Sequence, residues 1–483
     1  MIDQDAAYLA LTSRDARFDG VFFVGVTSTG IYCRPICPVK APRISNCLFF
    51  SSAEAAEKAG FRPCLRCRPE LAPGNAPVDN GQQIAGRLMQ QIDEGLIEQV
   101  NSLEEIAARF DLSLRQLRRI VQKELGVSPQ ELRQTRRLLL AKQLLSETRL
   151  PVTEIAFASG FSSLRRFNAA FSHQYRMPPT RLRKVLTTSP EHLDKQASSV
   201  LQLAYRPPYH WQAMLDFLRI RALTGVEYVD EDSYSRTVRL GQHCGWIRVQ
   251  QQAEKHLLQV EFSHTLIPVL PALLRRLRNL FDLDARPDLI AAHLSQDPLL
   301  QPAVLAYPGL RVPGAFDGFE MAVRAILGQQ ITVKAAATLG GRFAAAFGEP
   351  FLTPFPQLTH LSPLPERVTE CCVDDIASLG IVSARTRCIL ALAAACTQNG
   401  LQLDAATLPE KTIAELLALP GIGDWTAQYL AMRALRWPDA FPAGDIVIRN
   451  NLGKISIKEA EKHSQIWRPW RSYAVMYIWH ALG

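Results

Sequence analysis

The sequence has no long uncharged apolar run: none approaches the roughly 18 residues that a membrane-spanning helix needs. Its first residues, Met1–Asp5, are acidic and lack the apolar stretch of a signal peptide. We therefore expect a cytoplasmic protein with no membrane partner. In a reducing compartment, its ten cysteines are expected to act as metal ligands or reactive thiols and not as disulfides.

Acidic residues are scarce in the first two-fifths of the chain. Residues 1–190 hold 26 Lys and Arg against 18 Asp and Glu, whereas residues 191–483 hold 28 of each. The formal net charge of +8 therefore comes entirely from the front part, which is typical of a segment that binds nucleic acid. A basic but idle surface would show the same count. The hydrophobic content of 47% excludes a disordered chain.

The chain is predicted to be a multidomain α+β protein. Two polar segments with proline and no apolar periodicity, 71–80 and 187–199, are expected to be linkers. Helical spacing dominates between them, and an alternating, strand-like pattern follows residue 201. We expect a small four-cysteine domain, an all-α domain, an antiparallel α+β domain and a mostly α domain, over residues 1–70, 81–186, 201–283 and 284–483.

Four cysteines in the first domain have the spacing of a zinc site. Cys33 and Cys37 form a C-x3-C pair, and Cys64 and Cys67 form a C-x2-C pair. Four thiolates complete the tetrahedral shell that Zn²⁺ favours, so we expect one zinc ion. The ion can act purely as a structural support for so small a domain. A zinc-bound thiolate also remains a nucleophile, so the spacing leaves a reactive role open.

The segments around these cysteines resemble a known family. Thr29–Cys37 and Ala59–Cys67 are similar to the N-terminal zinc domain of the Ada family of bacterial alkylation-response regulators. The resemblance implies that Cys33 is both a zinc ligand and a catalytic nucleophile, which takes a methyl group irreversibly from a methyl phosphotriester in DNA. That family normally continues into an O6-methylguanine methyltransferase with a Pro-Cys-His-Arg motif. The only Pro-Cys here is Pro63-Cys64, so we expect no such activity.

The second domain carries a duplicated helix-turn-helix pattern. Helices are predicted over 102–110 and 114–125, and the pattern recurs at 152–159 and 163–175. A helical hairpin with a solvated charged face would have the same spacing. A basic second helix also fits the major groove of DNA. The basic residues of the two second helices that we expect to bind DNA are Arg115, Arg118, Arg119, Arg165 and Arg166.

This pattern resembles the AraC-type DNA-binding domain. Phe157–Ser162 followed by Arg165–Phe167 carries the resemblance, and a long helix over about 129–148 would join the two units. The resemblance implies binding to promoter DNA through recognition helices at Ser113–Glu124 and Ser162–Tyr175. RNA polymerase is then a further expected partner.

The C-terminal half contains a glycine hairpin followed by a carboxylate. In Leu419–Ala427, Gly421 and Gly423 separate two predicted helices. Backbone N–H groups at such a turn can hold a DNA phosphate, although a plain helix–helix turn has the same sequence. Asp445 lies in a Pro/Gly loop 20 residues after Trp425. Taken alone, a loop aspartate is more often a helix N-cap than a catalyst.

Together these features resemble the helix-hairpin-helix glycosylase superfamily, and within it the AlkA family of 3-methyladenine DNA glycosylases. Similar segments are spread over nearly all of residues 201–483. The resemblance implies that Asp445 is catalytic in the excision of alkylated bases, by stabilising charge on the sugar or by orienting water. It also implies that the hairpin contacts DNA and holds a monovalent cation.

The resemblance assigns the remaining site residues. Trp425, Tyr429 and Trp479 would line the base pocket, because electron-rich rings attract a cationic base; core packing is the alternative for Tyr429. Strand-cleaving members carry Lys at the position of Trp425, so we expect hydrolysis without a lyase step. Gln330 stands where the familiar family sequence has an intercalating Leu, and it is the expected wedge in the DNA.

The sequence thus predicts a monomeric fusion protein of the bacterial nucleoid. Its front half would sense methylated DNA and activate promoters, and its back half would excise alkylated bases from double-stranded DNA. Two alternatives remain: a transcription factor with a silent glycosylase-like domain, and a glycosylase whose front half only tethers it to DNA.

Overall fold

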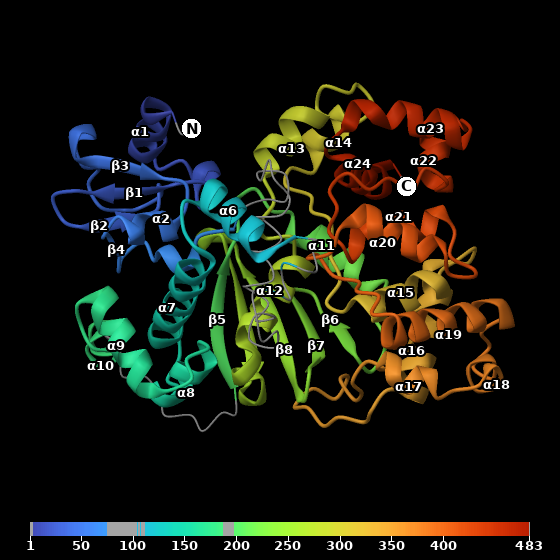
Figure 1. The fold of residues 1–483 in the computed structure, drawn as a ribbon. Coiled ribbons are helices and arrows are strands. Elements are labelled where there is room, and N and C mark those ends of the chain that lie inside the picture. Colours follow the sequence, from blue (N-terminus) through green and yellow to red (C-terminus); the bar gives the residue numbers. More distant parts are fainter. Residues whose placement is uncertain (1–2, 75–103, 105–106, 108–111, 187–197, 483) are drawn as a thin grey trace. The chain divides into compact units, whose positions relative to one another are not determined.

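A computed structural model describes residues 3–74, 104, 107, 112–186 and 198–482 of the chain (Figure 1). Much of the two predicted linkers, and most of the predicted helix over 102–110, lies outside these residues. The chain forms two compact units, one made of residues 1–207 and 252–275 and the other of 208–251 and 276–483. No helix among the described residues combines the length and the apolarity needed to cross a membrane.

The first unit begins with a four-stranded sheet in the order β3-β1-β2-β4, with β1 antiparallel to β2 and β3 and with β2 parallel to β4. Its helix α1 packs apolar side chains on this sheet, among them Leu11 against Phe22 and Val24. The elements are α1 (Gln4–Ser13), η1 (Ala16–Phe18), β1 (Phe23–Val26), β2 (Ile31–Cys33), η2 (Ile44–Asn46), β3 (Cys47–Phe50), α2 (Ala53–Lys58), β4 (Arg62–Pro63) and η3 (Pro69–Leu71).

Five helices follow in the same unit: α6 (Leu114–Leu125), α7 (Pro129–Glu147), α8 (Val152–Ala158), α9 (Leu164–Tyr175) and α10 (Pro179–Leu186). Local sequence fixes where two of them begin: Ser113 and Ser128 form capping boxes at the starts of α6 and α7. Phe167, Phe171 and Tyr175 form a chain of ring contacts along the buried face of α9. The predicted pair α8–α9 and the long joining helix α7 are therefore present.

The first unit also holds two paired strands from further along the chain. The strand β5 (Ser198–Ala204) is antiparallel to β9 (Leu257–Ser263), and β5 contacts α7. The elements η4 (Ala253–Lys255) and η5 (His264–Val269) flank β9, and α12 (Leu270–Leu280) follows.

The second unit begins with α11 (Trp211–Arg219) and an antiparallel meander of β6 (Glu227–Val229), β7 (Ser233–Leu240) and β8 (His243–Gln252). Alternate side chains of β8, such as Ile247 and Val249, are buried, as the period-two pattern predicts. The strand-rich character expected after residue 201 is thereby confirmed.

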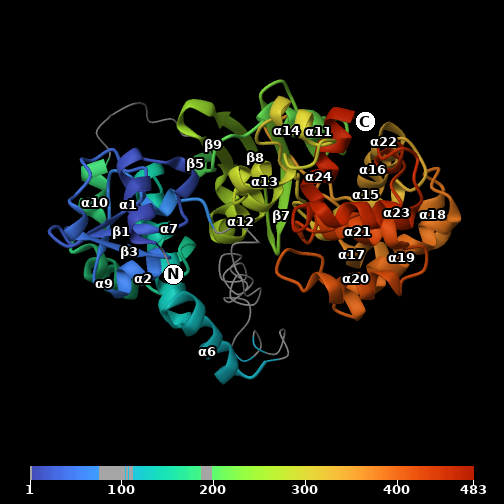
Figure 2. The ribbon, with the colours of Figure 1, turned by 90° about the horizontal axis from the view of Figure 1, so that it is seen from above.

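The rest of the second unit is helical. In it α15 packs against α16, α19 and α21, and α20 and α21 form a helical hairpin whose helices lie side by side (Figure 2). The helices are α13 (Pro287–Leu294), α14 (Gln301–Ala306), α15 (Gly318–Leu327), α16 (Val333–Phe347), α17 (Pro365–Thr369), α18 (Val373–Ala377), α19 (Ser383–Gln398), α20 (Pro409–Leu417), α21 (Asp424–Arg433), α22 (Ile446–Asn451), α23 (Ile457–His463), η6 (Ser464–Trp467), α24 (Arg471–Tyr477) and η7 (Ile478–Leu482). The predicted multidomain α+β class is confirmed.

Candidate zinc centre and candidate active site

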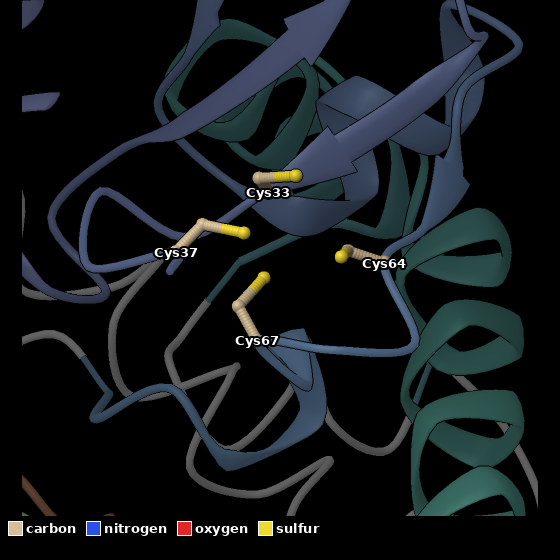
Figure 3. Close-up of side chains that lie close together, drawn as sticks. All are labelled: Cys33, Cys37, Cys64 and Cys67. Atoms are coloured by element: carbon tan, nitrogen blue, oxygen red, sulfur yellow. The ribbon is translucent and has the colours of Figure 1, made fainter. Parts of the chain in front are cut away.

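The four predicted cysteines converge at one point of the first unit. Their sulfur atoms all lie within 4.8 Å of one another and point into a common space (Figure 3). Tyr32 pairs with Pro63 between β2 and β4, which places the ligands that follow, Cys33 and Cys64, next to each other. Four sulfur donors at such short distances fit the tetrahedral shell of a zinc ion.

Cys33 differs from the other three cysteines in its exposure, because it is half-buried while they are buried. Arg34 beside it turns inward: its Nε donates to Asp19 at 2.8 Å and its Nη1 donates to the Cys67 carbonyl at 3.0 Å. The Arg34 backbone N–H also donates to the Cys67 sulfur at 3.3 Å. The Arg34 guanidinium therefore supports the loop that carries Cys67, and Cys33 is the most exposed of the four candidate ligands.

The arginines predicted to contact DNA are exposed on their helices. On α6, the buried residues Leu117 and Val121 lie on the apolar face. On α9, the apolar face holds Phe167 and Phe171. The exposed arginines on the two helices are Arg115, Arg118, Arg119, Arg165 and Arg166.

The glycine hairpin in the second unit has a conformation that requires glycine. Gly421 has a φ of +86°, and a Cβ there would lie 3.1 Å from Cys388. Gly423 is the N-cap of α21 and brings no capping side chain, so backbone N–H groups at this end can bind a phosphate. Gln329 donates to the Gly421 carbonyl at 2.9 Å. Gln330 follows it, exposed, with a φ of 54°.

Asp445 lies at the start of α22, where four N–H groups surround its carboxylate. Its Oδ1 accepts hydrogen bonds from the backbone N–H of Val447 at 3.0 Å and of Ile448 at 3.1 Å. The indole Nε1 of Trp479 donates to Oδ1 at 3.2 Å, and that of Trp425 donates to Oδ2 at 3.1 Å. Asp445 is therefore an N-cap and also the centre of a cluster that includes two predicted pocket residues.

The third predicted pocket residue joins the same cluster. Tyr429 stacks on Trp425 with ring centroids 5.1 Å apart and an interplanar angle of 7°, and its ring lies 6.1 Å from that of Trp479. The structure thus brings Trp425, Tyr429, Trp479 and Asp445 together.

The sequence reasoning missed two arginines behind these rings. Arg433 donates to the Tyr429 hydroxyl at 2.6 Å, and against the effect of burial the charges of Arg433 and Arg221 lower the pKa of Tyr429. The signal for Arg433 was its place one helical turn after Tyr429, whereas no local pattern indicated Arg221.

Successive parts of the chain are similar to known protein families. Four family descriptions match successive parts of the chain: the metal binding domain of Ada at residues 6–70, a helix-turn-helix domain at 106–185, the AlkA N-terminal domain at 200–317, and the HhH-GPD superfamily base excision DNA repair protein at 323–470. A "Probable bifunctional transcriptional activator/DNA repair enzyme AlkA" of Mycobacterium tuberculosis is 38% identical over 487 aligned residues, covering 99% of this chain and 97% of that protein. The chain belongs to this bifunctional family.

Two further similar proteins each match more than half of this member of the bifunctional family. The "DNA-3-methyladenine glycosylase 2" of Escherichia coli is 34% identical over 281 residues, which are 58% of this chain and 97% of that protein. A solved 3-methyladenine DNA-glycosylase from Archaeoglobus fulgidus matches with a TM-score of 0.51 at 18% identity, covering 57% of this chain and 96% of that one. The latter likeness shows a shared fold.

Proposed function

We propose that the rear half of this chain is a monofunctional DNA glycosylase, which hydrolyses the bond between an alkylated base of the 3-methyladenine type and its deoxyribose. The observation that carries the proposal is the position of the Asp445 carboxylate, at hydrogen-bond distance from two indoles of an aromatic cluster. The family resemblance and the relatives named above support the same activity.

The geometry suits this chemistry. A damaged nucleotide has to leave the duplex before its glycosidic bond is accessible, and a stack of aromatic rings can receive the extruded base. An alkylated purine is a good leaving group because it is already cationic. Positive charge then develops on the sugar, where the Asp445 carboxylate stabilises it or orients the attacking water. Gln330 would fill the gap in the duplex, and the N-terminus of α21 would hold a phosphate.

Substitution of the carboxylate tests this function. Asp445→Asn keeps the acceptor oxygen of the N-cap and removes the negative charge, so we expect the release of 3-methyladenine from methylated duplex DNA to fall to the uncatalysed level. Asp374→Asn, an exposed position on α18, is the matched control and should release bases at the wild-type rate. An Asp445→Asn protein that releases bases as fast as the wild type excludes the proposed role.

We further propose that Cys33 accepts a methyl group from a methyl phosphotriester. The Cys33 sulfur attacks the methyl carbon, a sulfur–carbon bond forms, the carbon–oxygen bond breaks, and the phosphate leaves as an ordinary anionic diester. The greater exposure of Cys33 among four converging cysteines supports this choice of nucleophile. Bound zinc would keep the thiolate deprotonated.

Mass analysis tests the methyl acceptor. After incubation with methylated DNA, the peptide that contains Cys33 should carry one added methyl group, and the Cys33→Ser protein should carry none on this peptide. Cys371→Ser, on the second unit, is the control and should leave methylation of Cys33 unchanged. A methyl group on another zinc ligand in the wild-type protein would overturn the assignment.

The remaining partners stay proposals. The exposed arginines of α6 and α9 support binding to promoter DNA, from which activation through RNA polymerase would follow. A monovalent cation at the Gly421–Gly423 hairpin, a monomeric state and a location at the bacterial nucleoid are likewise expectations.

A further inference from the structure

The loop between α15 and α16 holds an exposed glutamine in a strained backbone conformation. Gln330 is exposed and has a φ of 54°, which lies in the left-handed region that residues other than glycine seldom adopt. A strained conformation of this kind persists only where the surrounding structure holds it, and it is common where a protein binds a ligand. The neighbours of Gln330 must therefore keep this backbone in place.

The preceding residue, Gln329, binds the glycine hairpin through its side chain. Its amide nitrogen donates to the Gly421 carbonyl at 2.9 Å and to the Thr426 hydroxyl at 3.1 Å. The amide has two N–H groups, so both have an acceptor. Thr426 is buried on α21, directly after Trp425. The Gln329 side chain thus connects the loop both to the hairpin and to the helix that carries Trp425.

Arg385 on α19 holds the backbone of the same residue. Its guanidinium donates to the Gln329 carbonyl, and hydrogen bonds from a charged donor are among the stronger ones in proteins. This carbonyl belongs to the peptide group between Gln329 and Gln330. The bond therefore restricts the rotation of that peptide group, which would have to turn for Gln330 to leave its left-handed conformation.

These contacts fix Gln330 relative to two other parts of the second unit. One is the hairpin, where backbone N–H groups can bind a phosphate, and the other is the aromatic cluster beside Asp445. A side chain that enters a duplex as a base leaves it has to lie at a set distance from the pocket that receives the base. A loose loop would first have to be ordered on the DNA, at a cost in conformational entropy.

We propose that Gln329 and Arg385 are positioning residues for base extrusion, which hold Gln330 ready to enter the duplex while the damaged base moves into the aromatic cluster. This inference rests on the proposed glycosylase function and on the role of Gln330 in it. Because both residues act through Gln330, they contribute to the extrusion of the base and not to the hydrolysis that follows.

The test compares a paired with an unpaired damaged base. A DNA strand with a single adenine is methylated and annealed to one of two complements, which has either thymine or no nucleotide opposite that adenine. An unpaired base costs less to extrude, so its release depends less on Gln330. The single-turnover rate of 3-methyladenine release by the full-length protein is measured on both duplexes.

Removal of the Gln329 amide should slow the reaction on the paired duplex selectively. Gln329→Met keeps the length of the side chain and removes two hydrogen bonds, so the rate on the paired duplex should fall roughly tenfold. The rate on the unpaired duplex should stay within about twofold of the wild-type rate. Gln296→Met, at an exposed position just after α13, is the matched control and should leave both rates unchanged.

Two further substitutions test whether these residues act through Gln330. Arg385→Met removes the donor to the Gln329 carbonyl from a different helix, and it should cause the same selective loss. Gln330→Ala should cause it too. Gln329→Met added to Gln330→Ala should then lower the rate on the paired duplex little further, because the side chain that Gln329 positions is already gone.

The outcomes distinguish the inference from the function on which it rests. If the wild-type protein releases 3-methyladenine from neither duplex, the glycosylase function fails and the inference falls with it. If the wild type is active, the inference alone is overturned when Gln329→Met and Arg385→Met slow both duplexes equally, or slow neither. Losses that multiply in the double variant would also overturn it. Should Gln329→Met alone fail to fold, it loses both rates, and Arg385→Met decides.

Discussion

At the scale of single residues, the two oxygens of the Asp445 carboxylate accept different numbers of hydrogen bonds. Its Oδ1 accepts three hydrogen bonds, from two backbone N–H groups and from Trp479, whereas its Oδ2 accepts one, from Trp425. These bonds fix the plane of the carboxylate before any DNA arrives. Oδ2 is therefore the oxygen with a free lone pair for the sugar or the water, and Trp425 is what orients it.

This arrangement predicts a positioning role for an indole N–H. Trp425→Phe keeps an aromatic ring but removes the donor to Oδ2, so the single-turnover rate of base release should fall roughly tenfold while the affinity for damaged DNA changes little. Trp246→Phe, on β8, serves as the control for loss of an indole. A variant that binds DNA more weakly but reacts at the wild-type rate would show that Trp425 contributes only its ring.

The sequence led to Asp445 and the three aromatic residues through the resemblance to the AlkA family, which assigned them to the pocket. The local pattern favoured an N-cap and the family resemblance implied a catalyst; the structure shows that Asp445 caps α22 and also contacts the aromatic cluster, and its catalytic role stays a prediction. Arg433 and Arg221 were missed because they lie far apart in the sequence, and only the packed structure brings both of them near the Tyr429 hydroxyl.

At the scale of elements, the helix α7 connects the zinc domain to the helix-turn-helix domain. Lys142 on α7 is 1% exposed; it donates to the carbonyl of the zinc ligand Cys64 at 3.2 Å and pairs with the buried Glu70. Arg68 in the zinc loop reaches Glu147 at the end of α7 at 2.5 Å. The metal loop is thus held by the same helix that joins the two helix-turn-helix units.

Removal of the Lys142 charge should loosen this connection. Lys142→Met leaves the buried Glu70 with Arg68 as its remaining charged partner, which we expect to cost up to about 3 kcal/mol. Hydrogen exchange should then be faster in residues 3–74 and in α7, while the second unit exchanges as before. Lys184→Met, an exposed position on α10, is the control. Unchanged hydrogen exchange in residues 3–74 would show that the Lys142 charge does not stabilise this domain.

The sequence predicted the position of α7 but not which of its side chains pair with the zinc domain. The joining helix, expected over about 129–148, is present as α7 from Pro129, and Ser128 directly before it is its capping residue. The partners Lys142 and Glu70 lie 72 residues apart, and each taken alone has the pattern of an ordinary surface charge. Only the docking of α7 on the zinc domain shows that the pair is buried.

At the scale of the whole molecule, the first unit includes more than the two predicted front domains. Gln143 of α7 donates to the Gln202 carbonyl at 2.9 Å, and the Gln202 backbone N–H donates to Glu147 at 2.9 Å. The strand β5 is therefore hydrogen-bonded to α7, although most of β5 lies in the segment that matches the AlkA N-terminal domain. Hydrophobic patterning cannot predict such polar contacts, and the predicted border at residue 201 stays a prediction.

The balance of charge predicts how methylation acts on the front half. Four thiolates with one Zn²⁺ carry −2, which lowers the +8 of residues 1–190 to about +6, and a methyl group on Cys33 raises it to about +7. Less repulsion from phosphates should then tighten binding to DNA, and the gain should shrink as salt rises. Affinities of the methylated and unmethylated proteins at several salt concentrations check this; equal affinities at low salt would contradict it.

One chain is expected both to record alkylation damage on Cys33 and to repair it by base release. Incubation of the intact wild-type protein with methylated duplex DNA tests it most directly, with the mass of the Cys33 peptide and the released bases measured in the same sample. We predict a methyl group on Cys33 together with free 3-methyladenine. Release of bases from a protein whose Cys33 stays unmodified, or methylation of Cys33 without release of bases, would contradict the claim.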